Sequence, residues 1–224
     1  MDPFALARDQ SERTPGRYVG LALAVDGSIR AASFLDGAQL AEQPRSSVAS
    51  ITKPITATAV MQLVEAGEVE LQAPIETHIP EFRPRSSTGV PPAAPVTLGR
   101  ILSHTAGLTD LPDEELVQLP ATPAGMLRAV CGAQLSYAPG TEFRYASEPW
   151  YLLSATVERV SGEPFASFVR DRILQPLGMS STAFDPMAPG REPLPPLGGF
   201  GGPDASPEQR LQLFASLVMP GGGL

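Results

Sequence analysis

The first pattern along the chain is a pair of short apolar runs near the N-terminus. Tyr18 to Val25 and Ile29 to Leu35 are rich in the β-branched, aromatic and small apolar residues that suit a strand. Between them stands Asp26-Gly27, a dipeptide that tolerates the positive φ angles of a tight turn. These features predict two antiparallel strands joined as a β-hairpin.

The pattern then changes from strand-like runs to helical spacing. From Ile51 to Ala66 apolar side chains fall on one face of a helix, and Gly67 follows as a C-terminal stop. Thr97 is suited to cap a short helix that runs to Leu102. Pro149 and Pro164 then open two further helical stripes, whose aromatic members are interpreted as core. The stripes consist of Trp150, Leu153, Val157 and Val160, and of Phe165, Phe168, Val169 and Ile173.

Proline-rich stretches connect these segments. Pro80 to Pro95, Pro120 to Pro123 and Pro186 to Pro207 are interpreted as extended surface loops. Strands followed by a run of helices predict an α+β fold in which the helices are segregated from the sheet. We therefore expect an N-terminal segment with the β-hairpin in residues 1–45 and a helical lobe in residues 46–224.

Composition narrows the classes of partner. The formal net charge of -8 argues against binding to nucleic acid or to an anionic membrane surface, because both require clustered cations. The single cysteine, Cys131, excludes an internal disulfide and is interpreted as a buried apolar side chain. The cysteine and the two histidines are widely separated, so no metal site is predicted.

The N-terminal sequence also bears on localisation. MDPFALARDQSERTPGR has no apolar h-region, so no signal peptide is expected. The apolar run from Tyr18 to Val25 is too short to cross a bilayer. The sequence therefore predicts a cytoplasmic protein without a membrane span.

Lys53 is the only lysine of the chain, whose other basic side chains are arginines. It follows Ser50 in S-V-A-S-I-T-K-P at the i, i+3 spacing that places two side chains on one face of a helix. A serine becomes a nucleophile only when a base takes its proton, and a helix N-terminus favours the resulting alkoxide. The alternative interpretation is an amphipathic helix that carries a surface lysine.

A second motif follows about a hundred residues later. P-G-T-E-F-R-Y-A-S (Pro139 to Ser147) resembles the P-G-x-x-x-x-Y-S-N element of the class C β-lactamase and penicillin-binding-protein-like serine esterase family. Three more segments are similar to elements of that family, in the same order. They are R-I-L-S-H-T-A-G-L (Arg100 to Leu108), W-Y-L-L-S-A-T-V-E-R-V-S-G (Trp150 to Gly162) and I-L-Q-P-L-G-M-S-S-T-A-F (Ile173 to Phe184).

The resemblance implies a role for each matching residue. Ser50 would be the acylated nucleophile, and Lys53 would share or accept its proton. Tyr145 would relay a proton to the leaving group and help to activate the deacylating water. No cofactor is implied.

Ser147 departs from the family pattern, because a substrate-binding asparagine usually stands there. A serine reproduces only part of the hydrogen bonding of a carboxamide, which weakens the case for β-lactams and peptides and favours simple esters. The chain contains no asparagine at all, so its composition also accounts for the change.

The resemblance further implies a β-lactamase/transpeptidase-like fold, with a helical lobe and an antiparallel sheet. P-G-G-G-L (Pro220 to Leu224) resembles the family segment that leads into further strands and a third motif, K-T-G or H-x-G. No third motif is found, so we expect a fragment in which only the N-terminal strands of the sheet are present. Loss of one oxyanion donor costs roughly 2.7–4 kcal/mol, and an open sheet edge predicts self-association.

Two classes of function stay open. The first is a serine hydrolase that forms an acyl-enzyme on Ser50 from a small ester or amide substrate. Carboxylesterase or acyl-transfer activity is favoured over β-lactamase or D-Ala-D-Ala peptidase activity. The second is a catalytically impaired fragment, or a non-catalytic protein that keeps the helical lobe for binding or assembly.

The remaining polar candidates receive structural interpretations. His104, which could be a general base, is interpreted as structural, and His78 as a loop residue. The other candidates are Asp110, Glu114 and Glu115, interpreted as a solvated acidic loop, and Arg170, Asp171 and Arg172, interpreted as surface charges.

Overall fold

The computed structural model describes residues 2–16, 18–41, 47–86, 94–112, 119–120, 122–184 and 220. The chain forms two compact units, residues 1–45 and residues 46–224. Each unit is described by itself below.

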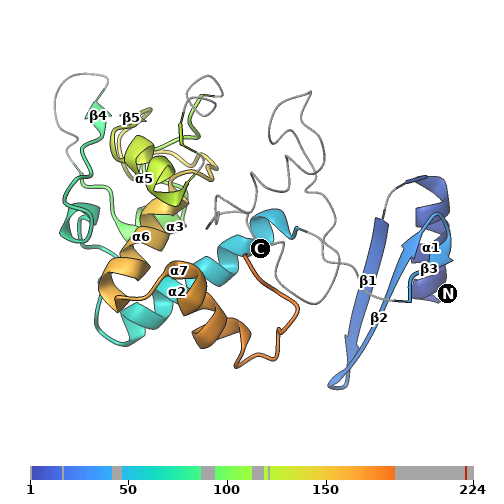
Figure 1. Ribbon diagram of the computed structural model, residues 1–224. Helices are drawn as coiled ribbons and strands as arrows, with labels where there is room; N and C mark the ends of the chain where they lie inside the picture. Colours follow the sequence, from blue (N-terminus) through green and yellow to red (C-terminus); the bar gives the residue numbers. More distant parts are fainter. Residues whose placement is uncertain are drawn as a thin grey trace. The chain divides into compact units, whose positions relative to one another are not determined.

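The N-terminal unit is built on the β-hairpin that the sequence predicts. Strand β1 (Tyr18–Val25) pairs antiparallel with β2 (Ser28–Leu35), and the short β3 (Ala38–Gln39) lies on the other side of β2 (Figure 1). The register runs from Tyr18 opposite Leu35 to Val25 opposite Ser28. Asp26 and Gly27 both have positive φ, at 48° and 76°, as a tight two-residue turn requires.

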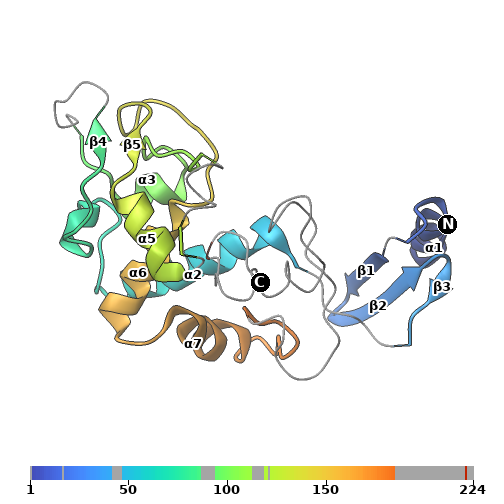
Figure 2. The same cartoon turned by 45° about the horizontal axis from the view of Figure 1, so that its top comes forward.

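Helix α1 (Pro3–Arg13) packs on this hairpin and was not predicted from the sequence (Figure 2). The Asp2 side chain accepts a hydrogen bond from the Phe4 N–H, and Pro3 occupies the first turn, where its missing N–H is not needed. Ala7 of the helix is buried together with Ala32 and Phe34 of β2. The helix therefore gives the hairpin an apolar core that two strands alone would lack.

The second unit is mainly helical. Its helices are α2 (Thr52–Glu65), α3 (Leu98–Leu102), α5 (Pro123–Cys131), α6 (Trp150–Ser161) and α7 (Phe165–Val169), with shorter turns η1 (Ala49–Ile51), η2 (Ile75–Thr77) and the π-helical η3 (Arg170–Leu174). Two short strands, β4 (Arg85–Ser86) and β5 (Gln134–Leu135), pair in parallel.

Helix α6 lies at the centre of this unit. It contacts α2, α3, α5 and α7 (Figure 1), and every residue from Trp150 to Val157 is buried. Such burial on all sides is typical of a helix inside a core. The predicted stripe of α7 and η3, from Phe165 to Ile173, contributes buried side chains to the same core. Cys131 is buried there too, as predicted, and burial raises the pKa of its thiol to about 11.

Local signals in the sequence place several helix ends correctly. The Thr97 hydroxyl accepts a hydrogen bond from the Arg100 N–H at the start of α3. Gly162 ends α6 in the left-handed conformation, with φ of 73°.

The loop predicted at 186–207 lies outside the described residues.

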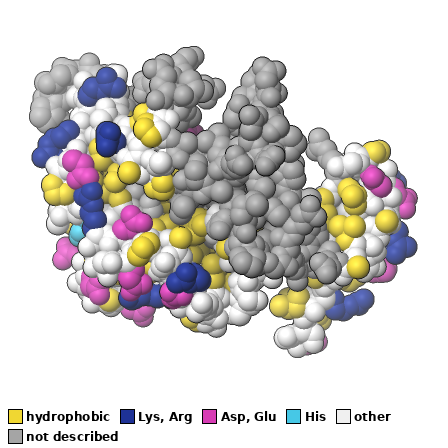
Figure 3. All heavy atoms as spheres, viewed as in Figure 1, with side chains coloured by type: hydrophobic (Ala, Val, Ile, Leu, Met, Phe, Trp, Pro, Cys, Tyr) yellow, Lys and Arg dark blue, Asp and Glu magenta, His cyan; other side chains and the backbone are white. Residues whose placement is uncertain are grey.

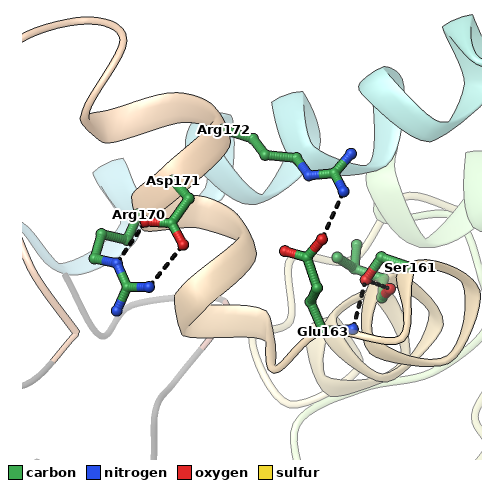
Figure 4. A network of polar contacts seen from close by, with 6 residues as sticks. Ser161, Glu163, Arg170, Asp171 and Arg172 are labelled. Atoms are coloured by element: carbon green, nitrogen blue, oxygen red, sulfur yellow. Dashed lines mark hydrogen bonds and ion pairs between the residues drawn. The ribbon is translucent and has the colours of Figure 1, made fainter.

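The charged residues of η3 lie on the surface, as predicted. The Arg170 guanidinium binds the Asp171 carboxylate at 2.6 Å, and Arg172 binds Glu163 at 2.6 Å (Figure 4). All four side chains are substantially solvent-accessible, so water and salt screen each pair and it adds little to the stability of the fold. Figure 3 shows charged side chains of both signs interspersed on one face of the helical unit.

Among the described residues, no helix combines the length and the apolar character needed to cross a membrane.

Two distant loops of the helical unit are joined through their backbones. The Ser136 N–H donates to the Gly107 carbonyl at 2.8 Å, and the Gly140 N–H donates to the Thr105 carbonyl at 2.7 Å. Gly107 has φ of +82°, and a Cβ at this position would lie only 2.4 Å from the Tyr137 carbonyl oxygen. A side chain at position 107 would therefore separate the loops.

We predict that Gly107→Ala destabilises the protein more than Gly162→Ala. Both glycines have positive φ, which costs an alanine about 1–2 kcal/mol, but an added Cβ at Gly162 meets no atom within 4 Å. The clash at Gly107 adds roughly 1–3 kcal/mol. Urea unfolding with an unchanged m-value measures the difference. Equal midpoints for the two variants would contradict the close approach.

Candidate active site

Ser50 lies in the 3₁₀ turn η1, immediately before helix α2. The preceding residue, Ala49, has a left-handed backbone with φ of 47°, which is unfavourable for a residue with a Cβ. The Ala49 N–H is held by the Ser47 hydroxyl at 3.2 Å, and the Ile51 N–H by the Val48 carbonyl at 3.0 Å. This strained turn presents Ser50 at the surface of the helical unit rather than inside the α2 ladder.

Lys53 stands in the first turn of α2 and reaches Ser50. Its Nζ donates a hydrogen bond to the Ser50 Oγ at 3.2 Å and another to the Ser147 Oγ at 3.1 Å. The lysine is only 5% exposed, so the alternative of a surface lysine is wrong. A buried ammonium group of this kind needs hydrogen-bond partners to compensate its lost hydration.

Tyr145 completes the group. Its hydroxyl donates to the Ser50 Oγ at 2.5 Å, and its ring lies 4.6 Å from the Lys53 Nζ. The second distance is within the range of a cation–π interaction. The structure thus brings Ser50, Lys53, Tyr145 and Ser147 together, although Tyr145 is separated from Ser50 by 95 positions in the chain.

The surroundings of Tyr145 favour its ionised form. Burial by itself raises the pKa of the phenol, but hydrogen bonding with Lys53 and Ser50 and the charge of Lys53 outweigh it. A smaller contribution comes from Ser147. The net pKa lies below the ordinary value of 10.0, so a phenolate base becomes accessible closer to neutral pH.

His104 supports the tyrosine rather than the serine. Its imidazole stacks on the Tyr145 ring with centroids 4.5 Å apart, and its Nδ1 accepts a hydrogen bond from the Ala146 N–H at 3.3 Å. Its carbonyl accepts from the Arg144 N–H at 3.0 Å. Burial, and then the charge of Lys53, lower the pKa of the imidazole, whereas Asp110 raises it. These contacts agree with the structural role expected from the sequence.

Asp110 lies in a loop and is exposed, as predicted, but its carboxylate also makes contacts that the sequence does not predict. Asp110 Oδ1 accepts hydrogen bonds from the backbone N–H groups of Ser147 at 2.5 Å and Glu148 at 3.3 Å. The sequence does not reveal that Asp110 and Glu148 lie side by side, because they are 38 positions apart and no local motif joins them. Glu114 and Glu115 lie outside the described residues.

The start of the P-G-G-G-L segment also reaches α2. The Thr56 hydroxyl, which is fully buried, donates to the Pro220 carbonyl at 2.5 Å. Thr56 lies almost one helical turn after Lys53. Within the described part of the chain, no cluster of three or more His, Cys, Asp or Glu residues could hold a metal ion.

The family model described as Beta-lactamase matches residues 5–224. The chain belongs to the beta-lactamase family. The comparisons with solved structures confirm the β-lactamase/transpeptidase-like α+β fold expected from the sequence.

One relative within this similarity is named an esterase. The chain is 36% identical to Esterase EstB of Burkholderia gladioli over 179 residues, which are 71% of this chain and 43% of EstB. The chain therefore spans less than half the length of this relative.

Two solved structures are similar over nearly the whole chain. EstCE1, described as a hydrolase with promiscuous acyltransferase activity, has 25% identity and a TM-score of 0.69, covering 98% of this chain and 68% of that one. A penicillin-binding protein from Bacillus halodurans has 24% identity and a TM-score of 0.70, covering 96% and 68%. The similarity to the Bacillus halodurans protein is evidence for the fold alone.

We predict that Tyr145→Phe slows acylation of Ser50 by a fluorophosphonate by roughly 10²–10⁴-fold, the usual contribution of a positioned acid–base group. Phenylalanine keeps a ring against His104 and Lys53 but loses the oxygen that contacts Ser50. Intact mass spectrometry against time measures the rate.

Tyr137→Phe is the matched control, because the Tyr137 hydroxyl binds the His104 carbonyl instead of Ser50. Its labelling rate should stay within about threefold of wild type, as expected for the loss of one hydrogen bond of ordinary strength. Equal rates for Tyr145→Phe and Tyr137→Phe would contradict a chemical role for the Tyr145 oxygen.

Proposed function

We propose that this chain carries the acylation site of a serine hydrolase, and that its substrates are small esters. The observation that carries the proposal is the position of the Ser50 Oγ, within hydrogen-bond distance of both the Lys53 Nζ and the Tyr145 hydroxyl. A nucleophile with two such neighbours is the usual signature of covalent catalysis. The esterase name of EstB and the acyltransferase description of EstCE1 support the same reaction class.

The proposed reaction uses Tyr145 in its ionised form. The phenolate takes the proton of the Ser50 hydroxyl while Oγ attacks the acyl carbon, and the Lys53 ammonium stabilises the phenolate beside it. The tetrahedral intermediate collapses, the bond to the alcohol oxygen breaks, and Tyr145 returns its proton to that oxygen. Water then attacks the acyl-enzyme while Tyr145 takes one of its protons. The bond between the acyl carbon and the Ser50 Oγ breaks, Tyr145 returns the proton to Oγ, and the acid is released. Another alcohol in place of water gives acyl transfer.

Ser147 is the proposed reason for a preference for esters. Its hydroxyl is already an acceptor for Lys53, and it has no amide group to offer to a substrate. Simple esters carry no amide on their acyl side, the group that an asparagine at this position would hold, so they lose least by this replacement. The preference separates the proposal from the alternative of β-lactamase or D-Ala-D-Ala peptidase activity.

The decisive experiment is labelling with a fluorophosphonate followed by intact mass spectrometry. We expect one adduct on the wild-type chain, no adduct on Ser50→Ala, and an unchanged adduct on Ser161→Ala, which removes a serine at the last position of α6. Hydrolysis of a chromogenic short-chain ester should follow the same order. Absence of any adduct on the wild type would support the other expectation, a catalytically impaired fragment or a non-catalytic binding protein.

We also predict that Ser147→Asn shifts acylation from esters toward amides. The carboxamide adds a donor and an acceptor, and one added hydrogen bond changes a rate by about tenfold. The measured quantity is the ratio of the acylation rates with a chromogenic cephalosporin and with a short-chain ester. Ser147→Ala is the control, because it removes the hydroxyl without adding an amide. A ratio equal in both variants would contradict the proposed role of Ser147.

A further inference from the structure

Asp110 holds the backbone of the segment that carries Ser147. It lies in the loop after α3, and its Oδ1 accepts the N–H groups of Ser147 and Glu148. These donors immediately precede helix α6, whose first N–H, that of Trp150, donates to the Ser147 carbonyl at 3.1 Å. One carboxylate oxygen therefore fixes the turn from which the Ser147 hydroxyl reaches Lys53.

Glu148 raises a problem of hydrogen bonding. As a carboxylate, it leaves Oε2 buried without a donor, and a charged oxygen in that position is strongly unfavourable. The Asp110 carboxyl lies beside it, because Asp110 Oδ1 is 3.3 Å from the Glu148 backbone nitrogen, and a hydrogen bond between the two carboxyl groups shifts the pKa of each. Two carboxylates cannot bond to each other, because neither carries a proton. One proton between them turns Glu148 into a donor and removes its charge.

We propose that Glu148 and Asp110 share one proton, and that this acid–carboxylate pair is a positioning element that holds Ser147 against Lys53. The consequence for acylation rests on the function proposed above. Asp110 remains the charged member, because it accepts the two backbone N–H groups. Glu148 remains the protonated member, because its carboxyl is the more deeply buried of the two.

The electrostatic surroundings assign the proton in the same way. Burial, then the hydrogen bond and the charge of Asp110, raise the pKa of Glu148 to about 8, although Lys53 acts in the opposite direction. Burial also raises the pKa of Asp110, but the hydrogen bonds from Glu148 and from two backbone N–H groups outweigh it and lower the pKa overall. Among the described residues, His104 faces Asp110 and Tyr151 faces Glu148 as further titratable groups.

The pair is therefore sensitive to pH in one direction. Between the lowered pKa of Asp110 and about pH 8 it carries one proton and one negative charge. Above that pH two carboxylates face each other, their hydrogen bond is lost, and their repulsion loosens the hold of Asp110 on Ser147. Acylation that depends on this hold should decline on the alkaline side.

Glu148→Gln tests the pair, because glutamine keeps a donor toward Asp110 and cannot ionise. The measurement is the second-order rate of Ser50 labelling by a fluorophosphonate, from about pH 6 to about pH 10. We expect the ratio of the Glu148→Gln rate to the wild-type rate to rise by about tenfold across pH 8. Glu148→Ala, which has no donor, should be slower than Glu148→Gln at every pH.

Glu142→Gln is the matched control, since Glu142 is exposed and its carboxylate pairs with the Arg144 guanidinium. Its pH profile should follow the wild type. Parallel profiles for the wild type and Glu148→Gln would overturn the inference while leaving the proposed function intact.

A second measurement does not depend on activity. A carboxyl group whose pKa is raised in the folded state stabilises that state fully below its ordinary value of 4.5, and this contribution is lost as pH rises toward 8. The free energy of unfolding of the wild type should therefore fall, relative to that of Glu148→Gln, as pH rises from about 4.5 to about 8. A constant difference would overturn the shared proton. If the wild type shows this pH dependence but Ser50 is never labelled, the proton sharing stands and the proposed function fails.

Discussion

The candidate site depends on a single buried ammonium group. Lys53 is almost excluded from solvent, and a buried cation is tolerated only where polar or aromatic groups replace its water. The hydroxyls of Ser50 and Ser147 accept its hydrogen bonds, and the rings of Tyr145 and Trp150 lie 4.6 and 5.5 Å away. These partners come from the turn before α2, from the tyrosine loop and from α6. The lysine is thus well solvated by the protein only when all three segments are in place.

The tyrosine loop is held by main-chain contacts, so its geometry does not rest on side chains of the reacting group alone. The Arg144 N–H binds the carbonyl of His104, and the Ala146 N–H binds its imidazole. His104 itself has a left-handed backbone, with φ of 56°. A strained residue that is fixed on both sides is a common support for an active-site loop.

The sequence predicts those parts of the fold that depend on a few neighbouring residues. The Asp26-Gly27 turn, the Thr97 cap and the Gly162 helix end follow from local backbone preferences. The S-x-x-K spacing predicts the contact between Ser50 and Lys53 because it requires only one helical turn. The place of the tyrosine came from family resemblance, since no local rule spans 95 positions.

The features that the sequence does not predict depend on tertiary contacts. Helix α1 has few apolar positions, and its stability comes from covering Phe34 in the hairpin. Asp110 and Glu148 look like ordinary surface acids until folding brings the loop after α3 against the start of α6. Their hydrogen bonds then give an acidic residue a structural task that its immediate neighbours do not reveal.

The contact between Thr56 and Pro220 links helix α2 to a part of the chain 164 positions away. A valine at position 56 would fill the same space but would leave the Pro220 carbonyl with no donor from the helix, and such exchanges in a buried site are usually unfavourable. Shape alone is therefore not sufficient at this position. The helix that carries the lysine therefore has one buried hydroxyl that is satisfied by a residue far along the polypeptide.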